Sequence, residues 1–295
     1  MAESGSKIGG FSREDLVQLT KARLSALVVL TTAAGYVSAT QLTEQAFNFW
    51  TLANTIIGTL FAAFGAAVFN QLMEIDRDAK MKRTADRPLP AGRIPPIAAF
   101  GLGWVLCALG MVHLGNLVGG TPAWLAGATI AVYIFAYTPL KRRSSWNTIV
   151  GAVSGAIPPA IGWTAGGGGV FDIEAGWWFA LLFFWQLPHF FAINWVHRGE
   201  YKRAGFVMLA NSDDTGRKTS SWALIFALAL VGLAIAAPWL EMCSWWSLIP
   251  GLAAALALVW LSLKFVQERS VKSARIVFFG TLIYLPVALA TLLLL

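Results

Sequence analysis

The sequence is poor in cysteine, in charge and in regular repeats. Its two cysteines, Cys107 and Cys243, offer neither a disulfide framework nor the spacing of a metal site. Charged residues make up only 13% of the chain and hydrophobic residues 57%, which is more apolar surface than the core of a soluble protein of 295 residues can bury. No repeat at a solenoid period is evident. These absences exclude a disulfide-stapled secreted domain, a repeat array and a soluble enzyme, and they indicate one integral membrane domain.

Long apolar runs divide the chain into spans. A helix needs about 20 apolar residues to cross a hydrocarbon core ~30 Å thick. Nine such runs occur, at residues 22–40, 50–72, 96–115, 121–139, 146–165, 175–196, 219–240, 246–267 and 273–295. The sequence therefore predicts an all-α integral membrane protein with nine transmembrane helices in residues 21–295. Residues 1–20 are polar, mixed in charge and unlike a cleavable signal peptide. We expect them to form a cytoplasmic N-terminal arm whose first part, "MAESGSKIGGFSRED", is a disordered lead-in with an interfacial start.

Lysine and arginine are missing from every second predicted loop. All 22 lie in the N-terminal arm or around the loops after the second, fourth, sixth and eighth spans, whereas the other loops carry acidic residues as their only charges. Because cytoplasmic loops retain basic residues, we predict a cytoplasmic N-terminus and a C-terminus on the other side of the membrane. This topology explains the net charge of +7 by contact with a lipid bilayer and needs no nucleic-acid partner.

The second span runs into an unusually charged stretch, "NQLMEIDRDAKMKRTADRPLPAGR". Asn70, Glu74 and Asp78 are four residues apart, so a continuing helix places them in one stripe, while Asp76 falls on its far side. Carboxylates with an amide oxygen suit Mg²⁺, which proteins often share with the phosphates of a substrate. The stripe therefore predicts a magnesium site that faces a cavity.

Basic residues follow the acidic stripe closely. Lys82, Arg83, Arg87 and Arg93 supply the charge that could hold a diphosphate. The alternative to a binding site is a loop without a function of its own, whose charges neutralise one another at the level of the lipid headgroups. The prolines of "RPLPAG" favour a site, because they fix the path of the chain directly after the charges.

The loop after the fourth span, "YTPLKRRSSWN", carries Lys141, Arg142 and Arg143. Taken alone, such a cluster is more often a topological anchor than a site.

Polar residues also follow the sixth span, in "WQLPHFFAINWVHRGEYKRAG". On one continuous helix, Gln186, His189, His197 and Glu200 share a face. Ionisable groups at membrane depth usually face an internal cavity, although a lone histidine there is often only a structural hydrogen-bonding group. We expect these residues and the acidic stripe to meet in one central cavity that opens to the cytoplasm.

These motifs resemble the UbiA-type intramembrane prenyltransferases. The first acidic motif of that superfamily, N-x-x-x-D-x-x-x-D with a K-R-T-x-x-R-P-L-P-x-G tail, is matched without a gap by Asn70, Asp78 and "KRTADRPLPAG", with Glu74 in place of the first Asp. The heme-prenylating branch is suggested by "YTPLKRRSSWNTIVGAVSGAIPPAIGW", by "LPHF" and by "EYKRAGFVML". The resemblance extends from Lys21 to the last span. It implies nine helices around a central cavity, capped by the loops after the second and sixth spans.

The resemblance also implies an activity. Members of this branch transfer a farnesyl group from farnesyl diphosphate to the 2-vinyl group of heme B with addition of water, giving heme O and diphosphate. The metal would be Mg²⁺, held by Asn70, Glu74 and Asp78, with Lys82, Arg83 and Arg87 neutralising the diphosphate. The second acidic motif is reduced to "HRGEY", which leaves Glu200 as its one acidic metal ligand and puts a second cation in doubt.

Heme is the acceptor that this resemblance implies. His189 would orient it through the iron or a propionate, with His197 and Glu200 nearby, and its propionates would meet Lys141, Arg142 or Arg143. The expected setting is a bacterial cytoplasmic (inner) membrane, with hand-off of product to heme A synthase or to assembly factors of a terminal oxidase. Two alternatives stay open: a polyprenyltransferase acting on a quinone precursor such as 4-hydroxybenzoate, and a membrane transporter. Against the transporter, no pair of short, broken spans occupies corresponding halves of the chain.

Overall fold

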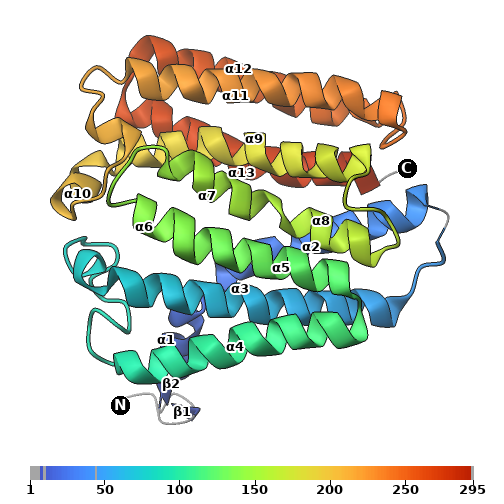
Figure 1. Ribbon diagram of the computed structural model, residues 1–295. Coiled ribbons are helices and arrows are strands. Elements are labelled where there is room, and N and C mark those ends of the chain that lie inside the picture. The colour runs from blue at the N-terminus through green and yellow to red at the C-terminus, as the bar shows by residue number, and fades with distance from the viewer. Residues whose placement is uncertain (1–6, 9–10, 44, 294–295) are drawn as a thin grey trace, which may run out of the picture.

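The computed structural model describes residues 7–8, 11–43 and 45–293 and consists almost wholly of helices (Figure 1). Two short strands, β1 (Lys7–Ile8) and β2 (Phe11–Ser12), pair antiparallel ahead of them. The α-helices are α1 (Arg13–Leu19), α2 (Ala22–Leu42), α3 (Phe49–Asp78), α4 (Pro96–Leu117), α5 (Gly120–Ala131), α6 (Thr138–Leu140), α7 (Asn147–Ala156), α8 (Pro158–Ala165), α9 (Ile173–Val196), α10 (Arg198–Arg203), α11 (Arg217–Ala236), α12 (Leu248–Glu268) and α13 (Val271–Leu293). A π-helical segment, Val132–Tyr137, joins α5 to α6, and two 3₁₀ segments cover Leu209–Asn211 and Ala237–Leu240.

Within the described residues, nine helical segments are long and apolar enough to cross a membrane, which confirms the predicted number. Each lies within a few residues of its predicted span except the second, which continues past residue 72 to Asp78. The fifth span is broken between α7 and α8, where Pro158 cannot donate a backbone hydrogen bond. Lipid offers no hydrogen-bonding partner to the backbone. A long apolar run that crosses it therefore forms a helix, in which its backbone groups bond to one another.

The helices surround a central space. α2 packs against α3 and α8, α9 packs against α7, α11 and α13, and a small contact between α13 and α2 closes the ring. α4, α5, α11 and α12 lie on the outside and bury the smallest share of their residues, whereas α7 and α8 bury the largest. The described N-terminal and C-terminal ends lie at opposite ends of the bundle, as an odd number of spans requires (Figure 1).

The α2 and α8 helices approach each other backbone to backbone. A Cβ atom added to Gly162 would lie 1.8 Å from the carbonyl oxygen of Thr32, and one added to Gly35 would lie 2.1 Å from that of Pro159. Small residues permit this close approach, which is a common way to pack helices in lipid. The contact fixes α2, and with it one wall of the central space.

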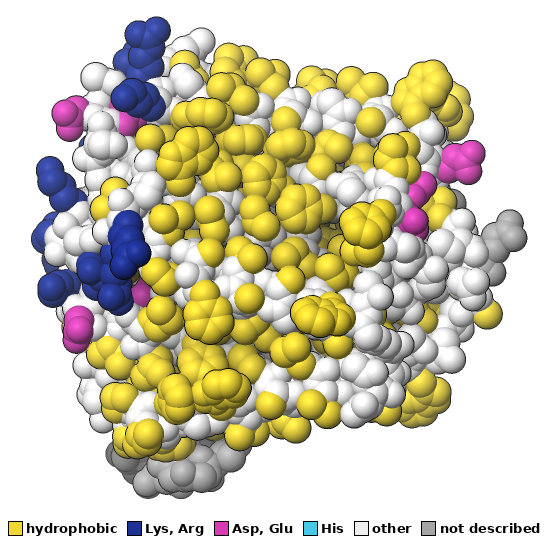
Figure 2. Space-filling view, in the orientation of Figure 1, with side chains coloured by type: hydrophobic (Ala, Val, Ile, Leu, Met, Phe, Trp, Pro, Cys, Tyr) yellow, Lys and Arg dark blue, Asp and Glu magenta, His cyan; other side chains and the backbone are white. Residues whose placement is uncertain are grey.

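Surface charge divides the molecule along its length. In Figure 2, hydrophobic side chains cover the middle of the bundle, and the visible lysine and arginine side chains gather at one end. We call this the basic end; it carries the loops after α3, α6, α9 and α12 (residues 79–95, 141–146, 197–216 and 269–270). The asymmetry agrees with the sequence, and the assignment of the basic end to the cytoplasm stays a prediction.

The expectation of a disordered lead-in over residues 1–15 is wrong for residues 11–15, which form β2 and the start of α1. The Ser12 hydroxyl accepts a hydrogen bond from the backbone N–H of Asp15 and caps α1, and Leu19 is fully buried. Asp15 also accepts a hydrogen bond from Arg93, at 2.7 Å, in an ion pair with the "RPLPAGR" loop. These contacts outweigh the polar composition that suggested disorder. The earlier part of the arm, residues 1–6, 9 and 10, lies outside the described residues.

Candidate functional site

A cavity of about 470 Å³ extends from the basic end into the bundle. Its walls come from α2, α3, the fourth span, α7 and α9, and the loops after α3 and α9 close the basic end. Among the described residues, four basic side chains and two carboxylates line it: Lys21, Arg83, Arg87, Lys141, Glu74 and Asp78. The formal charge of the lining is therefore positive, and such a cavity attracts anions.

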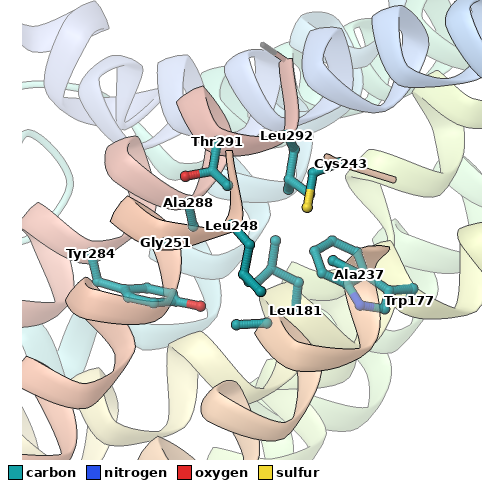
Figure 3. Close-up of a pocket in the computed structure, with 11 residues that line it drawn as sticks. Trp177, Leu181, Ala237, Cys243, Leu248, Gly251, Tyr284, Ala288, Thr291 and Leu292 are labelled. Atoms are coloured by element: carbon teal, nitrogen blue, oxygen red, sulfur yellow. The ribbon is translucent and has the colours of Figure 1, made fainter. Parts of the chain in front are cut away.

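A second, much smaller gap lies at the opposite end, among α9, α12 and α13 (Figure 3). Its volume is about 20 Å³, enough for roughly one water molecule. Its walls are mainly apolar, with Trp177, Leu248 and Leu292 among them. It is a packing gap and is too small for a substrate.

The acidic stripe lies on the cavity side of α3, although Asn70 is not among the residues that line the cavity. α3 continues as one helix to Asp78, which brings Asn70, Glu74 and Asp78 to the same face, all with at most 4% of their surface exposed. Glu74 and Asp78 line the cavity, and Asp76 is exposed on the other side of the helix. The Thr84 hydroxyl donates to the Asp78 carbonyl at 2.8 Å and closes the end of the helix.

Both carboxylates of the stripe pair with basic side chains. Lys141 Nζ donates to Glu74, at 2.9 Å from Oε1 and 3.2 Å from Oε2, and Arg87 Nη1 donates to Asp78 Oδ2 at 2.7 Å. Burial alone would lower the pKa of Lys141, but the charge of Glu74, the hydrogen bond to it and the neighbouring Tyr137 and Tyr133 together outweigh burial, so the pKa of Lys141 lies above its ordinary range. Lys141, which in isolation looked like an anchor, therefore belongs to the site as a permanent cation.

Lys21 is a site residue that the sequence did not reveal. It caps the start of α2 in a left-handed conformation (φ 49°, ψ 45°), and its Nζ donates to Asn70 Oδ1 at 2.6 Å. Burial lowers the pKa of Lys21 to about 7, and the positive charges of Arg87 and Lys141 act in the same direction. A bound anion would favour the charged form. In the sequence, Lys21 looks like any basic residue that precedes a span.

Both polar atoms of the Asn70 side-chain amide have hydrogen-bonding partners. Its Nδ2 donates to Thr138 Oγ1 at 3.1 Å, while Oδ1 accepts from Lys21. The Thr138 hydroxyl in turn donates to the carbonyl of Tyr133, inside the π-helical segment. Such segments are frequent at functional sites. This one brings Tyr133 and Tyr137 to the cavity, with the Tyr137 ring centroid 4.5 Å from Lys141 Nζ.

The loops after α3 and α9 meet across the basic end. Arg83 Nη2 donates to the Tyr201 hydroxyl at 2.8 Å, and both residues line the cavity. The Val207 backbone N–H donates to the Lys141 carbonyl at 2.7 Å, which ties the loop after α6 to the same cap. Burial raises the pKa of Tyr201, so its hydroxyl stays protonated. The expected cap over the cavity is therefore built by direct contacts.

Four of the predicted basic residues point elsewhere. Lys82, Arg93, Arg142 and Arg143 are exposed and do not line the cavity. Arg93 pairs with Asp15 and Asp86 instead of facing a diphosphate site. Arg142 donates to the Met73 carbonyl on α3, which gives it a structural role between two loops. The sequence neighbours of the lining residues Arg83 and Lys141 thus face away from the cavity.

The interpretation of Gln186, His189, His197 and Glu200 as one helical face is wrong. α9 ends at Val196, His197 leaves the helical conformation, and α10 starts a new direction at Arg198. Gln186 and His189 line the cavity, whereas His197 and Glu200 do not. His197 Nδ1 lies 3.9 Å from Glu200 Oε1, at the edge of an ion-pair contact.

The donor set fits a metal that is shared with a ligand. No group of three or more histidine, cysteine, aspartate or glutamate side chains is arranged to hold an ion within the described part of the chain. Glu74 and Asp78 provide oxygen donors, which suit Mg²⁺, but they are too few for a closed protein cage. Two carboxylates among several cations suit Mg²⁺ that arrives with a diphosphate.

The UbiA prenyltransferase family matches residues 28–284 of the chain. The chain belongs to this family. A relative named protoheme IX farnesyltransferase, from Opitutus terrae, is 40% identical over 280 residues, which are 94% of this chain and 93% of the relative. This UbiA prenyltransferase also shares its fold with solved structures. A digeranylgeranylglyceryl phosphate synthase has a TM-score of 0.79 at 15% identity, covering 95% of this chain and 96% of that one. A UbiA homologue from Archaeoglobus fulgidus bound to GPP and Mg²⁺ has a TM-score of 0.63 at 12% identity, covering 94% and 99%.

Proposed function

We propose that this UbiA prenyltransferase transfers a farnesyl group from farnesyl diphosphate to the 2-vinyl group of heme B, with addition of water, giving heme O and diphosphate. The name of the full-length relative supports the choice of substrates. The observation that carries the proposal is a single cavity with two unlike regions. Cations and carboxylates gather on the side of α2 and α3, and His189 lies among apolar groups on α9.

The charged region would bind the diphosphate. Lys21, Arg83, Arg87 and Lys141 can donate hydrogen bonds to phosphate oxygens as they exchange their present partners for the ligand. Mg²⁺ would be held by Glu74 and Asp78, with Asn70 as a third ligand once Lys21 turns to a phosphate, and it would neutralise charge on the leaving group. The Mg²⁺-bound homologue from Archaeoglobus fulgidus supports this choice of metal.

The walls suit a carbocation reaction. When the bond between C1 of the farnesyl group and its oxygen breaks, the electron pair leaves with diphosphate and an allylic cation remains. The aromatic faces of Tyr133 and Tyr137 line the cavity and can stabilise this cation. The vinyl π electrons then form the new carbon–carbon bond, and the cation left beside the porphyrin takes up water and releases a proton.

The apolar region would bind the heme. Leu182, Trp185, Phe190 and Ile193 on α9 line it together with His189. Aromatic and aliphatic side chains match the faces of a tetrapyrrole better than those of a small phenolic acid. The predicted contacts of Arg142, Arg143, His197 and Glu200 with heme, and of Glu200 with a second cation, are not part of this proposal, because these residues do not line the cavity.

The test is the mass of the product. Detergent-solubilised protein is incubated with hemin under reducing conditions, farnesyl diphosphate and Mg²⁺, alongside Glu74→Gln, Asp78→Asn and the matched control Asp76→Asn. We expect a farnesylhydroxyethyl heme from the wild type and from Asp76→Asn, and none from the other two variants. Prenylation of 4-hydroxybenzoate but not of heme would overturn the acceptor. Transfer to neither, with uptake of a solute into liposomes, would favour the transporter.

We also propose a bacterial cytoplasmic membrane as the location, with the basic end and the cavity mouth facing the cytoplasm and heme A synthase or an oxidase assembly factor receiving the product. The gathering of lysine and arginine at one end supports the orientation. Single cysteines at Lys82 and at Glu174, in a chain freed of Cys107 and Cys243, test it with an impermeant thiol reagent on intact cells. Labelling of the Lys82 position from outside would reverse the orientation.

A further inference from the structure

His189 is held against α13 by a hydrogen bond to Thr281, a residue that Trp185 also contacts. The two residues lie one turn apart on α9, and both meet Thr281 on α13. Trp185 Nε1 donates to the Thr281 carbonyl at 2.7 Å, and His189 Nδ1 lies 2.8 Å from Thr281 Oγ1. The Phe278 ring packs on the imidazole at a centroid distance of 4.5 Å and an angle of 31°. The imidazole is therefore held in both position and orientation.

The hydrogen bonds of Thr281 decide the tautomer of His189. Thr281 Oγ1 lies 2.6 Å from the carbonyl oxygen of Phe278, which can only accept, so the single hydroxyl proton goes there. Thr281 Oγ1 must then accept from His189, which places a proton on Nδ1. Nε2 is left with a free lone pair. Since His189 lines the cavity, this lone pair is the part of the ring available to a ligand.

A neutral imidazole fixed through Nδ1–H, with Nε2 free, is the arrangement of a metal-ligating histidine. Iron in heme is commonly held by such a histidine. Gln186 and Asn194 on α9 also line the cavity, and their amides donate to the Leu182 carbonyl and to Thr148 Oγ1. Met81 and Met208 pack in a cluster with Tyr201, while Lys21 and Lys141 have polar partners.

We propose that His189 Nε2 is an axial ligand to the iron of the substrate heme, and that Thr281 is the positioning residue that holds the ligating tautomer. The inference rests on the proposed function, since it takes heme as the acceptor. Ligation adds a dative bond from nitrogen to iron and moves no proton or electron. It pins the centre of the porphyrin to α9 while a vinyl group reaches toward the diphosphate.

The experiment titrates hemin into purified wild type, His189→Ala, Thr281→Val and Thr281→Ser and follows the Soret band and the electron paramagnetic resonance spectrum. We expect a histidine-ligated ferric spectrum in the wild type, its loss in His189→Ala, and its return when imidazole is added.

Thr281→Val should weaken hemin binding by about 10- to 100-fold, as loss of an outer hydrogen-bonding partner does, and Thr281→Ser should behave as the wild type. His113→Gln, on α4 outside the cavity lining, is the matched histidine control and should change nothing.

Metal-free protoporphyrin IX separates ligation from packing. If His189 binds iron, His189→Ala should lose affinity for hemin but keep its affinity for protoporphyrin IX. Equal losses for both, or wild-type spectra in His189→Ala, would overturn the inference. Binding of farnesyl thiodiphosphate, an unreactive analogue, verifies that each variant is folded. If the wild type ligates hemin through His189 but prenylates only a phenol, the proposed function is wrong and the ligation stands. If the wild type makes heme O but its hemin spectrum does not change in His189→Ala, the ligation is wrong and the proposed function stands.

Discussion

Lys141 Nζ contacts both carboxylate oxygens of Glu74, and the two side chains are 12% and 4% exposed. Removing one partner leaves a buried charge without compensation. We expect Lys141→Met to lower the free energy of unfolding by about 3 to 5 kcal/mol, and the double variant Glu74→Leu/Lys141→Met to regain most of it. Both should lack transferase activity. Unfolding in detergent measures the first effect; a single variant as stable as the wild type would contradict it.

The Mg²⁺ requirement of the protein should depend on the carboxylates on the cavity side of α3 and not on those on its exposed side. Asp78→Asn removes a charged oxygen donor from the cavity, so we expect it to raise the Mg²⁺ concentration for half-maximal binding of farnesyl thiodiphosphate, an unreactive analogue, by about tenfold or more. Asp76→Asn makes the same chemical change on the exposed side of the helix and should leave the requirement unchanged. A Mg²⁺ titration of both variants decides the point. Equal shifts in the two would mean that bulk charge, and not ligation, sets the requirement.

Lys21 should hold the diphosphate. Lys21→Met removes a charged donor from the cavity, and loss of such a hydrogen bond costs about 1.5 to 3 kcal/mol. The dissociation constant of farnesyl thiodiphosphate should therefore rise about 10- to 100-fold. Arg23→Met, two residues away and exposed, is the control and should bind like the wild type. If Lys21→Met also binds normally, Lys21 serves only to orient Asn70.

The contact between α2 and α8 leaves no room for a side chain at Gly162. We expect Gly162→Ala to cost about 3 kcal/mol or more, because the obstacle is the backbone carbonyl of Thr32 and cannot rotate away. Gly176 on α9 has open space around its Cβ position, so Gly176→Ala should be neutral or stabilise the protein by up to about 1 kcal/mol. Thermal unfolding of the two variants compares them directly.

Arg93 forms one ion pair with a mostly buried carboxylate and one with an exposed carboxylate, so its two partners show how burial changes the stability that an ion pair contributes. It contacts Asp15, whose side chain is 12% exposed, and Asp86, whose side chain is 94% exposed. We expect Asp15→Asn to cost about 1 kcal/mol and Asp86→Asn to have no measurable effect. Burial raises the pKa of Asp15, but its hydrogen bonds to Arg93 and Ser12 and the charge of Arg93 together outweigh this, and the net pKa lies below the ordinary 3.8. The contribution is thus complete above that value and is lost as the pH falls through the lowered pKa. The gap between wild type and Asp15→Asn should be constant from about pH 8 to pH 5 and shrink below about pH 4.

Much of the fold was predictable because the bilayer limits the choices. Apolar length located all nine spans in the described residues, and a spacing of four residues put Glu74 and Asp78 on the cavity side of α3. The partners of these carboxylates were harder to find, because Lys21 and Lys141 have the same local sequence signal as a topological anchor. The turn at His197 was missed for another reason. No proline marks it, so only the packing of α10 against the neighbouring loops reveals that one predicted helix is two.

The left-handed backbone at Lys21 has a consequence for protein engineering. A residue with a Cβ atom in this conformation costs roughly 1 to 2 kcal/mol, whereas glycine adopts it freely. A screen that rewards heat resistance alone will therefore favour Lys21→Gly, and this replacement deletes a cation from the cavity. Thermostable libraries of this enzyme should accumulate members with weakened diphosphate binding at position 21 unless turnover is selected at the same time.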